Sequence, residues 1–88
     1  MRTITIYGTD ECPMCVMLKN NLNKKNVEFE YIDILKNMTN LKQFLSFRDN
    51  SELFDDYKIN GKLGVPLSVI EENGEFKLFV ENYTGEFE

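Results

Sequence analysis

The sequence predicts an α/β domain with the element order β-α-β-α-β-β and a four-stranded mixed sheet. Three observations support this fold. Two strand-like segments enclose a helix-like segment, a second helix-like segment follows, and an Asn-Gly pair separates two short strand-like segments near the end. A helical connection joins parallel strands, whereas a tight turn joins antiparallel strands. With 88 residues, the chain fits a single domain, residues 1–88.

The first half of the chain predicts the parallel strand pair. Residues 2–7 alternate apolar and polar side chains, and residues 27–34 alternate strictly over their first half. Residues 8–11 form a short predicted loop, and a helix is expected from Cys12 to about Lys25. The apolar residues at helical spacing in this helix are Cys15, Leu18 and Leu22.

The second half predicts further helices and a hairpin. Asn40 and Gln43 match a capping box, so a helix is expected to start near Asn40. Ser51 is predicted to cap another short helix that ends at Asn60-Gly61. The strands of the hairpin are predicted at residues 67–71 and 76–80, with Asn73-Gly74 in a type I′ turn.

Composition narrows the range of functions. The formal net charge of −5 argues against a nucleic-acid binder and against adsorption to an anionic membrane, because both surfaces are negative. No segment has the apolar length of a signal peptide or a membrane span, so a cytoplasmic location is expected. A monomer is the default expectation for the oligomeric state.

The motif Cys12-Pro13-Met14-Cys15 is the main functional signal. Pro13 is well tolerated at the first helical position, which places Cys12 at the N-cap. Free N–H groups and the positive end of the helix dipole favour a thiolate there, and the thiolate is the attacking species. Cys15 is then expected to resolve the mixed disulfide by attacking Cys12.

Redox chemistry explains the two cysteines better than the alternatives. Zinc sites need four ligands, and the chain has no histidine and no third cysteine, so no metal site is expected. A purely apolar core role fits poorly for Cys12, which lies at a polar junction between loop and helix. A second signal is Gly64-Val65-Pro66 before the third strand, although a strand-entry proline is also common.

These features together resemble the glutaredoxin family of the thioredoxin-like superfamily, and the chain is most similar to small bacterial glutaredoxin-related proteins. The resemblance implies that Pro66 is cis and lies against the Cys12 thiol, and that the Val65 backbone pairs with a bound peptide or glutathione. It also implies that Lys19 helps to hold the thiolate charge. The last helix of the family is expected to be absent.

The resemblance also implies substrate contacts elsewhere. Part of the segment after the hairpin is similar to the family segment that binds the glutamyl end of glutathione. Arg48 is expected either to bind a substrate carboxylate or to act within the chain, in an intramolecular ion pair or as a charge at the helix C-cap. The residues assigned to substrate or glutathione binding are therefore Pro13, Met14, Lys19, Arg48, Val65, Pro66, Tyr83 and Thr84.

The sequence departs from the family pattern around the motif. Thr9 stands where many glutaredoxins have lysine, and Met14 replaces the usual aromatic residue. Asp10 and Glu11 precede Cys12, and their charges oppose a thiolate and an anionic tripeptide.

Three functions remain open on these grounds. The first is a dithiol oxidoreductase for protein or small-molecule disulfides, with no permanently bound cofactor. Its electrons would come from glutathione, as a co-substrate, or from a thioredoxin-reductase-type flavoprotein. The second is a glutathione-dependent iron–sulfur carrier, and the third is a non-catalytic protein-binding module.

Overall fold

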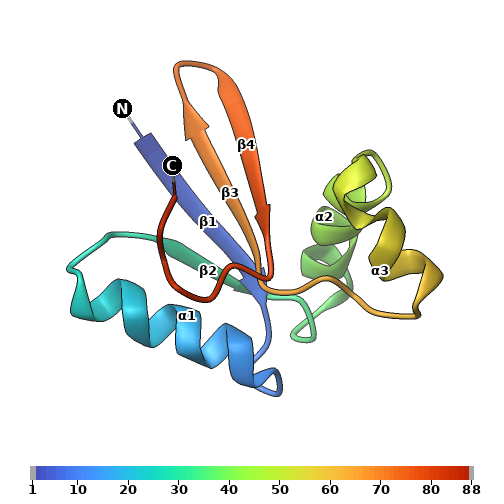
Figure 1. Cartoon of the computed structure of the whole chain (residues 1–88), viewed down its shortest axis with the longest axis horizontal. Coiled ribbons are helices and arrows are strands. Elements are labelled where there is room, and N and C mark those ends of the chain that lie inside the picture. Colours follow the sequence, from blue (N-terminus) through green and yellow to red (C-terminus); the bar gives the residue numbers. More distant parts are fainter. Residues whose placement is uncertain (1, 88) are drawn as a thin grey trace.

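Four strands form one mixed sheet in the computed structural model, which describes residues 2–87, and helices lie on both faces (Figure 1). The strand order is β2-β1-β3-β4. In chain order the elements are β1 (Arg2–Gly8), α1 (Pro13–Lys24), β2 (Glu30–Asp33), α2 (Met38–Arg48), the 3₁₀ helix η1 (Glu52–Phe54), α3 (Asp55–Ile59), β3 (Leu67–Glu72) and β4 (Glu75–Val80).

The pairing of the strands confirms the predicted topology. β1 runs parallel to β2, with Ile6 opposite Tyr31, and antiparallel to β3. β3 and β4 form the predicted hairpin. Asn73 and Gly74 at its tip have φ values of 55° and 79°, which are the positive angles that a type I′ turn requires.

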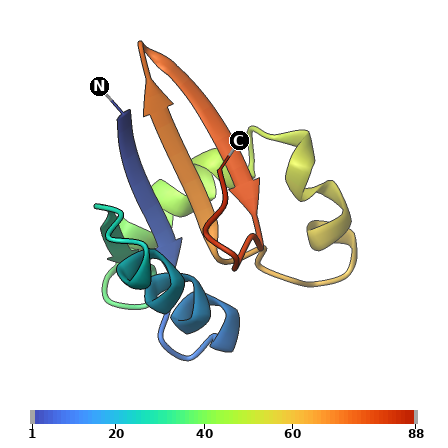
Figure 2. The same cartoon turned by 60° about the vertical axis from the view of Figure 1, so that its left-hand side comes forward.

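Alternation along the strands divides the core into two layers. Ile4 and Ile6 of β1 pack with Leu18 and Leu22 of α1. Tyr7 points to the opposite face, where the core also contains residues from α2, η1 and β3, namely Phe44, Phe54, Leu67 and Val69. Figure 2 shows α1 and the C-terminal segment in front of the sheet and α2 behind it. The sheet therefore holds the body of α1 on one face, while Cys15 at the start of this helix belongs to the cluster of Tyr7 and Phe44.

The second strand is shorter than predicted. β2 begins at Glu30 rather than at residue 27, because the preceding residues complete the end of α1. Asn26 adopts a left-handed φ of 57°, and the Val27 N–H donates to the Leu22 carbonyl at 3.0 Å. This six-to-one bond is the Schellman arrangement that closes a helix C-terminus.

The start of α2 also differs from the prediction. The N-cap is Asn37, whose side chain accepts a hydrogen bond from the Asn40 N–H at 2.8 Å. Asn40 therefore lies inside the first turn, and its own amide donates to the Asp33 carbonyl at 3.0 Å. An asparagine three residues earlier competes for the same role, and the sequence pattern alone did not separate the two.

The remaining segments agree with the prediction or lack regular structure. Ser51 caps η1 by accepting a bond from the Leu53 N–H, and α3 ends at Ile59, before Asn60-Gly61. Residues 81–87 contain no helix or strand and cross the α1 face of the sheet (Figure 1). Within residues 2–87, no helix combines the length and apolar character needed to cross a membrane.

Candidate active site

The two cysteines lie at the N-terminus of α1. Cys12 is the N-cap, with φ −103° and ψ 114°, and Pro13 occupies the first turn. The Cys12 carbonyl accepts hydrogen bonds from the N–H groups of Cys15 at 3.0 Å and Val16 at 3.2 Å. The Cys12 N–H donates to the Thr9 carbonyl at 3.1 Å, which fixes the loop against the helix start. The backbone therefore presents the motif as a rigid turn.

The two thiols are free and have unequal environments. Cys12 is half-buried, whereas Cys15 is completely buried in the core. Burial, helped by a hydrogen bond with the Cys12 side chain, raises the pKa of Cys15 from its ordinary value of 9.0 to about 12. Near neutral pH, Cys15 is therefore a protonated thiol next to the accessible sulfur of Cys12.

Gly8 makes room for the buried thiol. A Cβ atom at this position would stand 2.7 Å from the Cys15 Sγ and 3.2 Å from the Cys15 Cβ. Real side chains do not approach so closely, so the end of β1 needs a residue without a side chain. Gly8 thereby fixes the depth at which Cys15 sits behind the strand.

A groove of about 400 Å³ opens beside Cys12. The Val65–Pro66 peptide bond is cis, as the family resemblance implied, and Val65 forms one wall. No hydrogen bond joins the backbone N–H or C=O of Val65 to another residue in the range 2–87. The full lining is Cys12, Pro13, Met14, Lys62, Leu63, Gly64, Val65 and Glu81.

Arg48 supports one wall of this groove from behind. Its guanidinium donates to the Leu63 carbonyl at 3.1 Å and to the Lys62 carbonyl at 2.8 Å. Arg48 lies in the last turn of α2, as expected for a charge at the helix C-terminus, and it contacts main-chain oxygens rather than a carboxylate among the described residues. It does not line the groove, and substrate binding by Arg48 stays a prediction. The loop before the cis bond presents two carbonyls to the end of α2, a feature that no sequence pattern reveals.

Lys19 lies beside Asp10. Its ammonium group forms an ion pair with Asp10 and lies 4.1 Å from the centroid of the Tyr31 ring. The ion pair lowers the pKa of Asp10. A role of Lys19 in holding the charge of a Cys12 thiolate stays a prediction.

The predicted glutathione segment lies away from the groove. The Tyr83 carbonyl accepts a hydrogen bond from the Asn21 amide at 2.7 Å, and the Thr84 carbonyl accepts one from Lys25 at 3.2 Å. Both acceptors therefore lie against the second half of α1, more than one turn beyond Cys15. Neither Tyr83 nor Thr84 lines the groove beside Cys12, and their assignment to substrate binding stays a prediction.

Two charged residues of the groove were missed by the sequence analysis. Lys62 is exposed in the loop before the cis bond, and Glu81 follows β4 with a left-handed φ of 56°. The Glu81 N–H donates to the Pro66 carbonyl at 2.8 Å, which anchors this residue across the groove. The proximity of Lys62 to Pro66 in the sequence was a usable signal, whereas the position of Glu81 depends on the length of the hairpin.

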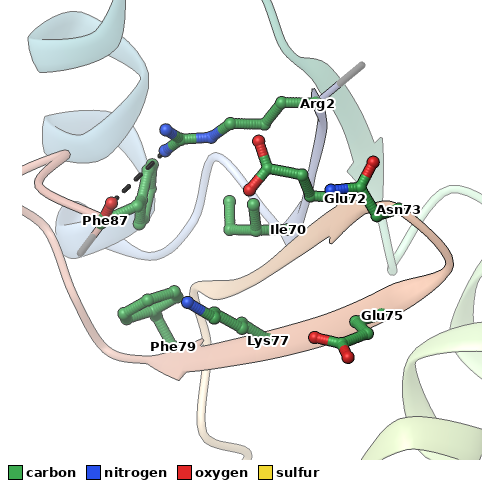
Figure 3. Close-up of a pocket in the computed structure, with 8 residues that line it drawn as sticks. All are labelled: Arg2, Ile70, Glu72, Asn73, Glu75, Lys77, Phe79 and Phe87. Carbon is green, nitrogen blue, oxygen red and sulfur yellow. Dashed lines mark hydrogen bonds between the residues drawn. The ribbon is translucent and has the colours of Figure 1, made fainter.

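A second hollow of about 300 Å³ lies at the other end of the sheet (Figure 3). Arg2 and Lys77 provide its cations, and the Arg2 guanidinium donates to the Phe87 carbonyl at 3.4 Å. Arg2 pairs with Glu72 in the sheet register, whereas Tyr7, at the motif end, pairs with Leu67. This hollow therefore takes no part in the chemistry of the cysteines.

The donor atoms needed for a metal do not gather at either hollow. In the described part of the chain, no three side chains of His, Cys, Asp or Glu are close enough together to hold a metal ion. The motif thus provides two thiols with a groove beside them, an arrangement suited to exchange with a disulfide.

Comparisons with known proteins agree with this site. The model of the family described as Glutaredoxin matches residues 4–66, a range that contains both cysteines and Pro66. A protein of Haemophilus influenzae, described as an uncharacterized protein, is 33% identical over 73 residues. The match covers 83% of this chain and 84% of that protein.

Proposed function

The chain belongs to the glutaredoxin family, and on that premise we propose that it is a thiol–disulfide oxidoreductase that reduces disulfides of proteins or small molecules. Cys12 is the nucleophile and Cys15 is the resolving thiol. The observation that carries the proposal is the unequal burial of two neighbouring thiols, with the accessible one at a helix N-cap beside an open groove.

The reaction needs both thiols in turn. The Cys12 thiolate attacks one sulfur of the substrate disulfide, forms a bond to it, and displaces the other sulfur, which takes a proton from solvent. Cys15 then loses its proton and attacks the Cys12 Sγ, which releases the second substrate thiol. The substrate gains two electrons, and Cys12 and Cys15 are left as a disulfide that a reductant must reopen.

The shape of the groove favours an extended substrate segment. The N–H and C=O groups of Val65 lack partners within residues 2–87 and face a groove that begins at the Cys12 sulfur. An extended peptide can satisfy both groups by adding one short strand-like contact. Pro13, Met14 and Leu63 supply apolar contact on the other sides.

The charges of the groove support glutathione as co-substrate in one orientation. Lys62 can bind a carboxylate, and Glu81 can bind an ammonium group, so together they match a zwitterionic peptide. Glutathione carries both kinds of group. The proposal places the protein in the cytoplasm, where glutathione and flavoprotein reductases keep thiols reduced.

The decisive experiment compares two cysteine variants on a mixed disulfide between a peptide and glutathione. C12S should form no covalent adduct and show no turnover. C15S should trap the adduct on Cys12, because the resolving thiol is missing. Intact mass spectrometry under non-reducing conditions measures both results, and C12S that still turned over the substrate would overturn the proposal.

A second measurement identifies the electron donor. The oxidised protein is mixed with glutathione or with thioredoxin reductase and NADPH, and the return of free thiols is followed. We expect reduction by glutathione, slowed by up to about fivefold in K62Q through a raised KM, since one exposed charge contact contributes at most about 1 kcal/mol. Reduction by the flavoprotein alone would remove glutathione from the proposal and leave the dithiol chemistry in place.

A further inference from the structure

The Tyr31 hydroxyl is buried and has no hydrogen-bond partner with good geometry among residues 2–87. Buried hydroxyls are nearly always bonded, because leaving water without a new partner costs free energy. Phenylalanine would fill the same space without this cost. The Asp10 carboxylate is close enough to act on this hydroxyl as a hydrogen-bond acceptor, a smaller cause than burial of the raised pKa of Tyr31, but the two groups form no bond of good geometry.

The hydroxyl lies beside the resolving thiol. Tyr31 is in β2, and its Oη stands 3.3 Å from the point where a Gly8 Cβ would be, while the Cys15 Sγ stands 2.7 Å from the same point. The missing side chain of Gly8 thus leaves one small space that both groups enter. The charge of a Cys15 thiolate raises the pKa of Tyr31, which is further evidence of their proximity.

Charged groups surround this space on its outer side. Asp10 lies near enough to Tyr31 and Cys15 to raise the pKa of both, and Asp33 acts on Tyr31 in the same direction. Lys19 pairs with Asp10 and covers the Tyr31 ring. Asp10 is exposed, so it connects the buried space with solvent.

The resolving step poses a chemical problem that these groups can solve. Burial is the largest cause of the raised pKa of Cys15 and persists once Cys12 carries the substrate, so only a small fraction of Cys15 is ionised near pH 7. The thiolate is nevertheless the species that must attack Cys12. A hydrogen-bond donor in the same buried space would stabilise the charge as it forms, with more effect there than in water.

We propose that the Tyr31 hydroxyl donates a hydrogen bond to the Cys15 sulfur as its proton leaves to solvent. This inference rests on the proposed dithiol function. In the step, the Cys15 Sγ–Cys12 Sγ bond forms and the Cys12–substrate S–S bond breaks. The electron pair leaves on the substrate sulfur, which takes a proton from solvent.

The test separates the two chemical steps with an aromatic disulfide whose released thiolate is coloured. Fully reduced protein should release one equivalent when Cys12 attacks and a second when Cys15 resolves. In Y31F we expect an unchanged first phase and a second phase slowed by roughly tenfold or more, the usual effect of a hydrogen bond to a charged group. Y7F is the matched control, because it removes a tyrosine hydroxyl from the neighbouring strand, where the Tyr7 ring packs on Phe44 and Phe47.

Stability and a second variant keep the inference open to refutation. Y31F should be as stable as the unaltered protein or more stable, since it removes an unpaired buried hydroxyl. D10N should leave the slowing by Y31F in place, because the hydrogen-bond donor is the hydroxyl and not the carboxylate. D10N should itself speed the second phase, since the charge of Asp10 raises the pKa of Cys15.

Two results would overturn the inference. One is a second phase of normal rate in Y31F, and the other is the loss of the Y31F effect in a D10N background, which would show that the hydroxyl acts through Asp10 and not on the sulfur. Failure of the dithiol function itself would look different. In that case the two-phase release would persist with the aromatic disulfide, while the peptide–glutathione substrate would not turn over.

Discussion

Replacing Gly8 with alanine tests how the strand positions the resolving thiol. The new methyl group would stand 2.7 Å from the Cys15 Sγ, and Cys15 is fully buried, so the sulfur has little room to move. Overpacking of this kind costs about 1–3 kcal/mol. The lower chain entropy of unfolded alanine offsets about 0.4–1 kcal/mol of that cost. We therefore expect G8A to lower the free energy of unfolding by about 1–2 kcal/mol.

Urea denaturation of the reduced protein measures this change, and the melting temperature should fall by roughly 4–8 °C for each kcal/mol. A double-mutant cycle identifies the cause. In a C15A background the sulfur is absent, and the next neighbours of the methyl group stand at 3.2 Å and 3.3 Å. The cost of G8A should shrink there, with a coupling energy of roughly 0.5–3 kcal/mol. An equal cost in both backgrounds would refute the argument that Gly8 and the Cys15 sulfur compete for one space.

Three further outcomes follow from the same structure. Folding raises the pKa of Cys15 to about 12, so the native state holds this proton more tightly than the unfolded state. The free energy of unfolding should therefore be constant below pH 9.0 and fall between pH 9.0 and pH 12. A urea midpoint that rises over this interval would contradict the burial of Cys15. R48A removes two hydrogen bonds to the loop before the cis bond and should lower the free energy of unfolding by about 1 kcal/mol. It should also raise the KM for disulfide substrates, and R48K should restore the KM only in part. Unchanged kinetics in R48A would show that the loop holds its shape without the guanidinium. G64A places a Cβ atom 2.7 Å from the Phe54 ring at a position with a left-handed φ of 87°. Urea denaturation should show a free energy of unfolding lower by about 2–5 kcal/mol. A decrease of less than about 1 kcal/mol would mean that the ring moves freely.

Local sequence patterns were sufficient to predict the secondary-structure elements and the position of the proposed nucleophile, Cys12. Asn73-Gly74 fixed the hairpin because few residue pairs accept two positive φ angles. Pro13 fixed the start of α1 and placed Cys12 at its N-cap, because proline is favoured at that position. Where two similar signals lay close together, as at Asn37 and Asn40, the sequence did not decide between them.

The sequence by itself determined the order of elements, the hairpin, and the position of two thiols at a helix start. These features depend on residues that are close neighbours in the chain. The conformational preferences of those residues are enough to specify them. Only the tertiary structure decided that Glu81 joins Lys62 in the groove, that Arg48 holds the loop, and that Tyr31 lies beside Cys15. Each of these contacts joins distant segments, and its existence depends on strand register and loop length, which the local pattern of residues does not specify.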